Sequence, residues 1–269
     1  MTHARPPLQV GIAGVGLLGP GLTDWTQAVP LLRTPSDWTF APTVVPAPER
    51  LPPTERRRAS VAVKAAVVVA DQACAMAGLD AAHLATVFTS ASGDPSICHT
   101  MCEALAKPER VVSPTRFTNS VHNAPAGYWH IAVQSRSAST SLAAYDASAN
   151  AGLLEAAVQC TAARAPVLLV ACDMPYPAPL HALRPLPDVF AFALLLVPQT
   201  EAAPWHLQLA LTHEGEPARC DSDGLEQLRQ SIPAARALPL LQALARNEDL
   251  SMVIEAGEIG LALQVQAQR

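Results

Sequence analysis

Charged side chains are scarce in this sequence, and aromatic ones are scarcer. Only 15% of the 269 residues are Asp, Glu, Lys or Arg, and only 4% are Phe, Trp or Tyr. The formal net charge is −5, so the chain lacks the overall positive charge that attracts DNA or RNA. No apolar run reaches the roughly 20 residues that a membrane-spanning helix needs. We therefore expect no nucleic-acid partner and no membrane insertion.

Cysteine is also infrequent, with six residues scattered along the chain. Cys74 and Cys160 fall in helical patterns, which indicates reduced core side chains and not a disulfide framework. Reduced cysteines predict a cytoplasmic protein. Cys98, His99 and Cys102 resemble half of a zinc site, but no second Cys/His pair follows at ligand spacing. We expect no metal, and we interpret Cys98 and Cys102 as one buried helix face.

Hydrophobic residues make up half of the chain, enough for a sizeable core. Short apolar strands alternate with helical segments, which predicts an α/β layered fold with a mostly parallel, mixed sheet. The predicted strands cover residues 8–16, 84–92, 141–146, 165–173 and 189–197, and the predicted helices cover 59–77, 96–107 and 147–163. A strand, a helical stretch and a strand-like segment over 251–266 follow.

The glycines of the N-terminal strand match a nucleotide-binding pattern. Gly14, Gly16 and Gly19 have the G-x-G-x-x-G spacing of dinucleotide-binding proteins. Pro20 and Gly21 follow, however, where a helix N-terminus should receive the phosphates. Glycine used for a tight strand exit is the simpler interpretation, and we predict no cofactor.

Several strings of residues together resemble the N-terminal half of a β-ketoacyl synthase of the thiolase superfamily. They are CAMAGLD, TVFTSASGD, SPTRFTNSVHNAPAGYWHIA, SLAAYDASANAGLLEAA and APVLLVACD, and the resemblance spans roughly residues 8–197. The SVHNA string is the most specific, and it resembles the short chain length factors of aryl polyene and related pigment clusters. The resemblance implies a thiolase-like layered fold, essentially one half of it, with a ketosynthase-like domain over 1–200 and a C-terminal strand-helix-strand extension over 201–269 packed on the same domain.

In ketosynthases, the strand and turn at this point deliver the catalytic cysteine to a helix N-terminus. Matching without a gap puts Asp146 at the cysteine position, whereas a shift by two would put Ser148 there. A carboxylate is a poor acyl acceptor, and the chain ends before the half that supplies the family's two histidines could be complete. The resemblance therefore implies a chain that is not an enzyme by itself. We interpret Asp146 as an N-cap that accepts backbone N–H groups of the following helix.

The implied function is that of a chain length factor. Such a subunit pairs with a full-length ketosynthase, shapes its acyl tunnel during polyene, polyketide or fatty-acid-type elongation, and is visited by an acyl carrier protein. The residues implied to line the tunnel or the interface are Phe117, Val121, His122, Asn123, Ser141 and Asp146. Two alternatives stay open: a self-sufficient acyltransferase or thiolase-like enzyme that uses Asp146, Ser148 or His122, and a dinucleotide-binding oxidoreductase.

Overall fold

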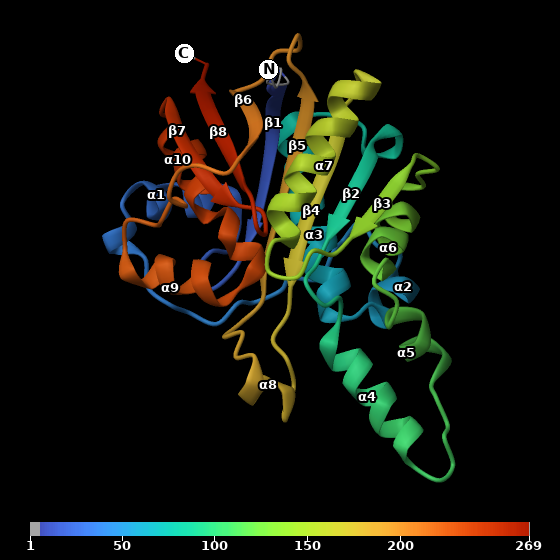
Figure 1. The fold of residues 1–269 in the computed structure, drawn as a ribbon. Helices are drawn as coiled ribbons and strands as arrows, with labels where there is room; N and C mark the ends of the chain where they lie inside the picture. The colour runs from blue at the N-terminus through green and yellow to red at the C-terminus, as the bar shows by residue number, and fades with distance from the viewer. Residues whose placement is uncertain (1–5, 269) are drawn as a thin grey trace.

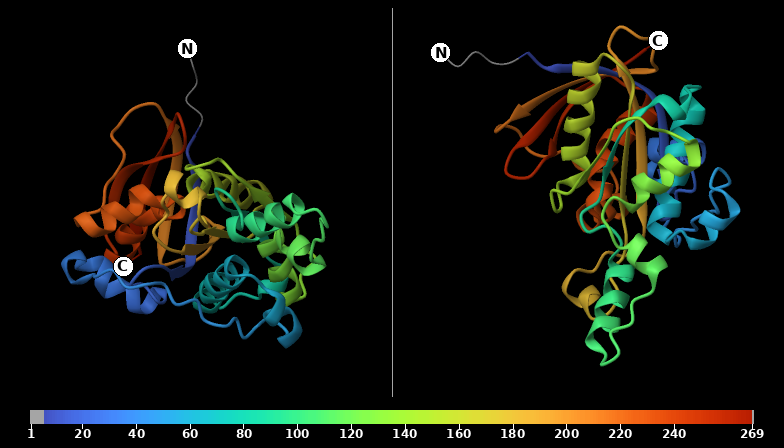
Figure 2. Two further views of the ribbon diagram at one scale, coloured as in Figure 1. Left: turned by 90° about the horizontal axis from the view of Figure 1, so that it is seen from below. Right: turned by 90° about the vertical axis from the view of Figure 1, so that its right-hand side faces the viewer.

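A computed structural model describes residues 6–268. Residues 1–5 of the first predicted domain and Arg269 of the second lie outside the described residues. Residues 6–268 contain eight strands in one mixed sheet, with helices on both faces (Figures 1 and 2). The strands are β1 (Leu8–Leu18), β2 (Ala85–Thr89), β3 (Ser139–Leu142), β4 (Val167–Asp173), β5 (Phe190–Pro198), β6 (Trp205–Thr212), β7 (Leu250–Glu255) and β8 (Gly260–Ala267).

The helices fall between these strands. They are α1 (Trp25–Arg33), α2 (Pro53–Arg58), α3 (Val61–Ala77), α4 (Pro95–Ala106), α5 (Pro114–Asn119), α6 (Ala124–Val133), α7 (Ser148–Ala163), α8 (Leu180–Leu183), α9 (Asp223–Ser231) and α10 (Leu238–Arg246). A 3-10 segment, Pro233–Ala237, precedes α10. The α/β class and the thiolase-like half-fold predicted from the sequence are confirmed.

The direction of the strands differs from the prediction. The order across the sheet is β3-β2-β4-β5-β1-β6-β8-β7, and β2 runs parallel to β3 and β4. The other neighbours in the described residues pair antiparallel, so a mostly parallel sheet was wrong. The reason is connectivity: a parallel pair needs a crossover, whereas β4 returns to β5 through a loop carrying only the short α8. The segment 251–266 is likewise a β7–β8 hairpin and not one strand.

Both faces of the sheet are buried, as the central strand β5 illustrates. Phe190, Phe192, Leu194 and Leu196 belong to the core beneath α7, α10 and the 3-10 segment. The residues between them belong to the core beneath α3 and α6. Because strand side chains alternate between faces, a strand buried on both sides is apolar at every position. This explains why the run around 190–197 carries no alternation of polar and apolar residues.

The glycines of β1 bring α3 close to the sheet. A Cβ built on Gly16 would lie 1.9 Å from the carbonyl oxygen of Val69, and one on Gly14 would lie 2.0 Å from that of Ala73. The strand continues through Leu18, and the next helix starts only at Trp25. No helix N-terminus therefore faces these glycines. Their role is helix–strand packing, and the glycine spacing lacks the helix that a dinucleotide fingerprint uses to bind phosphate.

Helix α4 projects away from the sheet with α5 (Figure 1) and buries only Pro95. Cys98 is half-buried and Cys102 is exposed, so the predicted buried cysteine face is wrong. All six cysteines lie in the described residues and are free thiols. Within residues 6–268, no helix is both long and apolar enough to cross a membrane.

Candidate functional site

The turn between β3 and α7 holds the position singled out by the sequence. Tyr145 adopts a left-handed backbone (φ 50°), which reverses the chain sharply before the helix. The buried Ser148 closes the turn: its Oγ donates to the carbonyl of Tyr145 at 2.6 Å and accepts from the N–H of Ala144 at 2.9 Å. A hydroxyl held in this way is a structural group and not an exposed nucleophile.

Asp146 is not the N-cap of α7, so that interpretation was wrong. Ala147 occupies the cap position, and no side chain there accepts a helix N–H. The carboxylate instead accepts from Nη2 of Arg184, and its second oxygen accepts from Nη2 of Arg236 at 3.1 Å. Charge-assisted bonds to two guanidinium groups are stronger than a bond to a neutral amide, and they hold the carboxylate away from the helix end.

The ion pairs continue beyond Asp146. Arg236 also donates to Glu255 at 2.7 Å, and Arg229 lies 3.8 Å from the same carboxylate. Arg229 is bidentate on Glu226, at 2.8 Å for both bonds. These bonds from Arg229 hold the pKa of Glu226 at about 2. Three carboxylates and three guanidinium groups therefore neutralise one another; we call them the ion-pair cluster, and it consists of Asp146, Glu226, Glu255, Arg184, Arg229 and Arg236.

Arg184 ties the α8 loop to the turn. Its guanidinium lies over the ring of Tyr145, 4.1 Å from the centroid, and 5.7 Å from the ring of Tyr176. Cation–π contact and the bond to Asp146 together fix the loop against the start of α7. The cleft between them has a volume of about 290 Å³, and none of its lining residues is Cys or His. Its groups can hold charge in place, but they offer no activated nucleophile.

Sequence reasoning missed the three arginines, because they come from the α8 loop, α9 and the 3-10 segment, far from Asp146 along the chain. Glu226 and Arg229 were detectable: they stand three apart in a predicted helix, where such pairs face each other.

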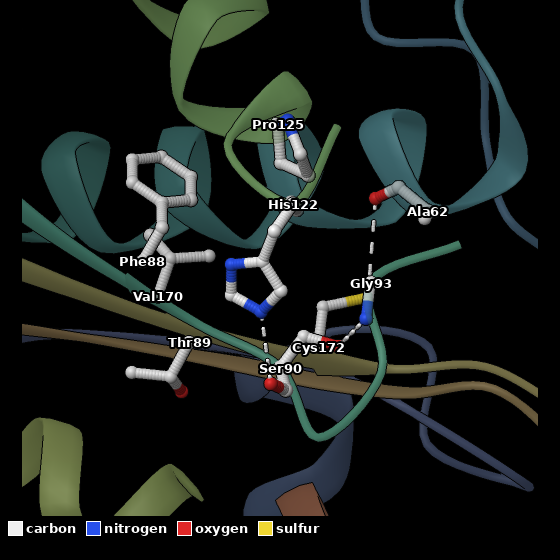
Figure 3. A pocket seen from close by; sticks show the side chains of 10 residues that line it. Ala62, Phe88, Thr89, Ser90, Gly93, His122, Pro125, Val170 and Cys172 are labelled. Atoms are coloured by element: carbon white, nitrogen blue, oxygen red, sulfur yellow. Dashed lines mark hydrogen bonds between the residues drawn. The ribbon is translucent and has the colours of Figure 1, made fainter. Parts of the chain in front are cut away.

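His122 lies away from the turn before α7, at a second site above the ends of β2 and β4 (Figure 3). Its Nε2 donates to the carbonyl of Ser90 at 3.0 Å. Ser90 in turn donates through Oγ to Asp173 at 3.1 Å, and Asp173 also accepts the N–H of Ala91 at 2.7 Å. Burial raises the pKa of the Asp173 carboxyl. The sequence signal for Asp173 was an acid ending a wholly apolar strand, but it was not singled out.

The six residues predicted to line the tunnel or the interface do not share one cavity. His122, Asn123 and Ser141 line an open groove of about 530 Å³ between α6 and the edge strand β3. Phe117 and Val121 are not among its lining residues and are 61% and 47% exposed. Asp146 lines the other cleft. The structure thus brings three of the six residues together, and their assignment to a tunnel or interface stays a prediction.

Replacing Phe117 by alanine is expected to cost less than about 1 kcal/mol of folding free energy, because this ring is already exposed to solvent. Phe192→Ala is the matched control, since that ring is buried between β5 and α7, and its loss should cost about 3 to 5 kcal/mol. Urea denaturation of both variants measures the difference. Equal losses would contradict the exposed position of Phe117.

Residues 33–256 match the family model described as β-ketoacyl synthase, N-terminal domain, and the chain belongs to this family. No curated protein sequence matches it significantly.

Solved structures with the same fold include ketosynthases and chain length factors. A ketosynthase in complex with its chain length factor from Xenorhabdus doucetiae is 22% identical, with a TM-score of 0.74 over 96% of this chain and 99% of the other. The ishigamide ketosynthase/chain length factor is 12% identical, with a TM-score of 0.70 over 98% and 100%. A type II polyketide synthase acyl carrier protein in complex with its ketosynthase is 11% identical, with a TM-score of 0.77 over 97% and 100%.

Proposed function

We propose that this chain is a non-catalytic chain length factor that pairs with an active ketosynthase and shapes its acyl tunnel. The observation that carries the proposal is the state of Asp146, which lies at the start of α7 where the resemblance puts the nucleophile. Its carboxylate is neutralised by Arg184 and Arg236. A carboxylate whose two oxygens each accept a hydrogen bond from a guanidinium group has its lone pairs engaged and is a poor nucleophile. The Ser148 hydroxyl is bonded within the turn, so the acyltransferase alternative has no free nucleophile here.

The surface around β3 supports the pairing. This strand is at one edge of the sheet, and its neighbour in the described residues is β2 alone. An open edge can accept a strand from another chain. Phe117 of α5, Val121 of the link that follows and Ile131 of α6 have exposed apolar side chains. Figure 1 shows α6 beside β3, with α5 next to α6. An edge strand beside exposed apolar groups suits a heterodimer interface with the ketosynthase.

The substrates follow from the partner. We propose that the pair extends a chain of the polyene, polyketide or fatty-acid type, that an acyl carrier protein delivers the units, and that the complex works in the cytoplasm. The likeness to ketosynthase and chain length factor complexes supports the first two points, and the free thiols of all six cysteines support the third.

The isolated chain is expected to catalyse neither malonyl decarboxylation nor condensation. The ketosynthase that copurifies with it should do so only in the reconstituted pair. Product formation from carrier-bound substrates, measured by mass spectrometry, tests this, with heat-inactivated protein as the control. Turnover by the isolated chain above that control would overturn the non-catalytic role, and failure of any ketosynthase to copurify would overturn the pairing.

A further inference from the structure

His122 separates two spaces of different character. On one side lies the open groove of about 530 Å³ between α6 and β3. On the other lies a small inner cavity of about 20 Å³, close to the volume of one water molecule. His122 lines both of them, and Figure 3 shows its ring standing at the centre of the residues around the inner cavity. The imidazole therefore separates the groove from the inner cavity, and we call it the partition.

The inner cavity is mostly apolar, although Thr89 and Ser90 also line it. Its wall includes Ala62 and Ala66 of α3, Phe88 of β2, and Val170 and Cys172 of β4. The two alanines leave room that larger side chains would fill, so the imidazole itself occupies space between α3 and the sheet. Removing the ring would join the cavity to the groove.

Asp, Glu, Lys and Arg are absent from the lining of the groove. Burial lowers the pKa of His130, which disfavours the charged form of that ring. The hydroxyl of the buried Thr86 lies 3.3 Å from Nε2 of His130 and donates to Oγ of Ser139 at 2.8 Å. Because Ser139 accepts this bond, its own hydroxyl proton can be donated to an acceptor in the groove. An acyl chain with oxygen functions suits such a surface better than a charged ligand does.

We propose that His122 is a specificity-determining residue that limits acyl chain length by closing the inner cavity to the distal end of the chain growing on the partner. This inference rests on the proposed function. The bond from Nε2 to the carbonyl of Ser90 holds the ring in this closed position. Once the ring is removed, the group that enters the inner cavity is the apolar end of an acyl chain.

The cavity can be tested without the partner. Xenon should leave the methyl NMR shifts of the unmodified chain near Ala62 and Val170 unchanged, and it should shift them in His122→Ala, because an apolar cavity of sufficient size binds xenon. His122→Phe keeps a ring in place and should behave like the unmodified chain. His122→Asn, which is smaller but polar, provides a second opening should His122→Ala fail to fold. No xenon response in either opened variant would overturn the partition.

The function of the partition is tested in the reconstituted pair. His122→Ala, or His122→Asn, is expected to lengthen the main product by at least one extension unit, whereas His122→Phe should leave it unchanged. Leu211→Ala is the control, since Leu211 is an exposed residue of β6 that lines neither the groove nor the inner cavity, and it should also leave product length unchanged. Unchanged lengths in the opened variants, with normal condensation, would overturn this inference alone. Absence of condensation by the unmodified pair would overturn the proposed function instead, and the xenon result would still decide whether His122 is a partition.

Discussion

Gly16→Ala is expected to prevent stable folding of this chain. The added Cβ would lie 1.9 Å from the carbonyl oxygen of Val69 and 2.8 Å from its carbonyl carbon, both in the backbone of α3. A backbone atom has no rotamer to change, so α3 would have to move away from β1 and open the core between them. We expect a loss of more than about 4 kcal/mol, comparable with the whole stability of many domains. Near-UV circular dichroism and urea denaturation measure it.

Gly127→Ala is the matched control for this substitution. Gly127 lies in α6, its added Cβ would meet nothing within 4 Å, and alanine is the better helix former by about 1 kcal/mol. This variant should be as stable as the unmodified chain or slightly more stable. A Gly16→Ala protein with an unchanged denaturation midpoint would contradict the close packing of α3 on β1.

Asp146→Ala is expected to cost about 3 kcal/mol, because it leaves the guanidinium group of Arg184, 19% exposed, without its carboxylate partner and leaves Arg236, 21% exposed, with Glu255 alone. Asp146→Asn should cost about 2 kcal/mol, since an amide bears no charge to neutralise them. An N-cap would behave differently, because asparagine caps as well as aspartate does. Urea denaturation at neutral pH separates the two accounts, and an undisturbed Asp146→Asn protein would contradict the ion-pair cluster.

Asp71→Ala is the control for the loss of an ion pair as such. Asp71 pairs with Arg50 on the surface, where both side chains are about 40% exposed, and exposed pairs contribute less than about 1 kcal/mol. A double-mutant cycle between Asp146→Ala and Arg236→Ala should then give a coupling energy above 0.5 kcal/mol, because the two side chains are in contact. Strict additivity would mean that the pair contributes nothing.

Most of the secondary structure was predictable from local pattern. Helix α3 ends at Ala77, the residue where the predicted helix over 59–77 ends, and Gly78 follows with φ 66°, a conformation typical of glycine after a helix. The buried strands β4 and β5 were visible as short apolar runs. The turn before α7 was visible as well, since small residues surround Tyr145 and Asp146. These features depend on neighbours within a few residues, which the sequence displays directly.

The candidate site was only half predictable. His122 was singled out through the resemblance of its sequence string, but its position between a groove and a cavity depends on α3 and β4, which are distant along the chain. Asp146 was singled out as well, yet its partners and hence its role were wrong. The charges that surround it come from three segments whose meeting no local pattern records.

The α/β class, the positions of most helices and strands, and the absence of a cysteine just before α7 followed from the amino-acid sequence. Secondary-structure propensity, hydrophobic periodicity and residue identity depend on a few neighbouring residues, so they can be evaluated from the amino-acid sequence without the fold. The tertiary structure alone decided the antiparallel direction of most strands, the use of Gly14 and Gly16 for packing against α3, and the pairing of Asp146 with Arg184 and Arg236. Each of these depends on which distant segments the chain brings into contact, and that is settled by the packing of the whole core at once.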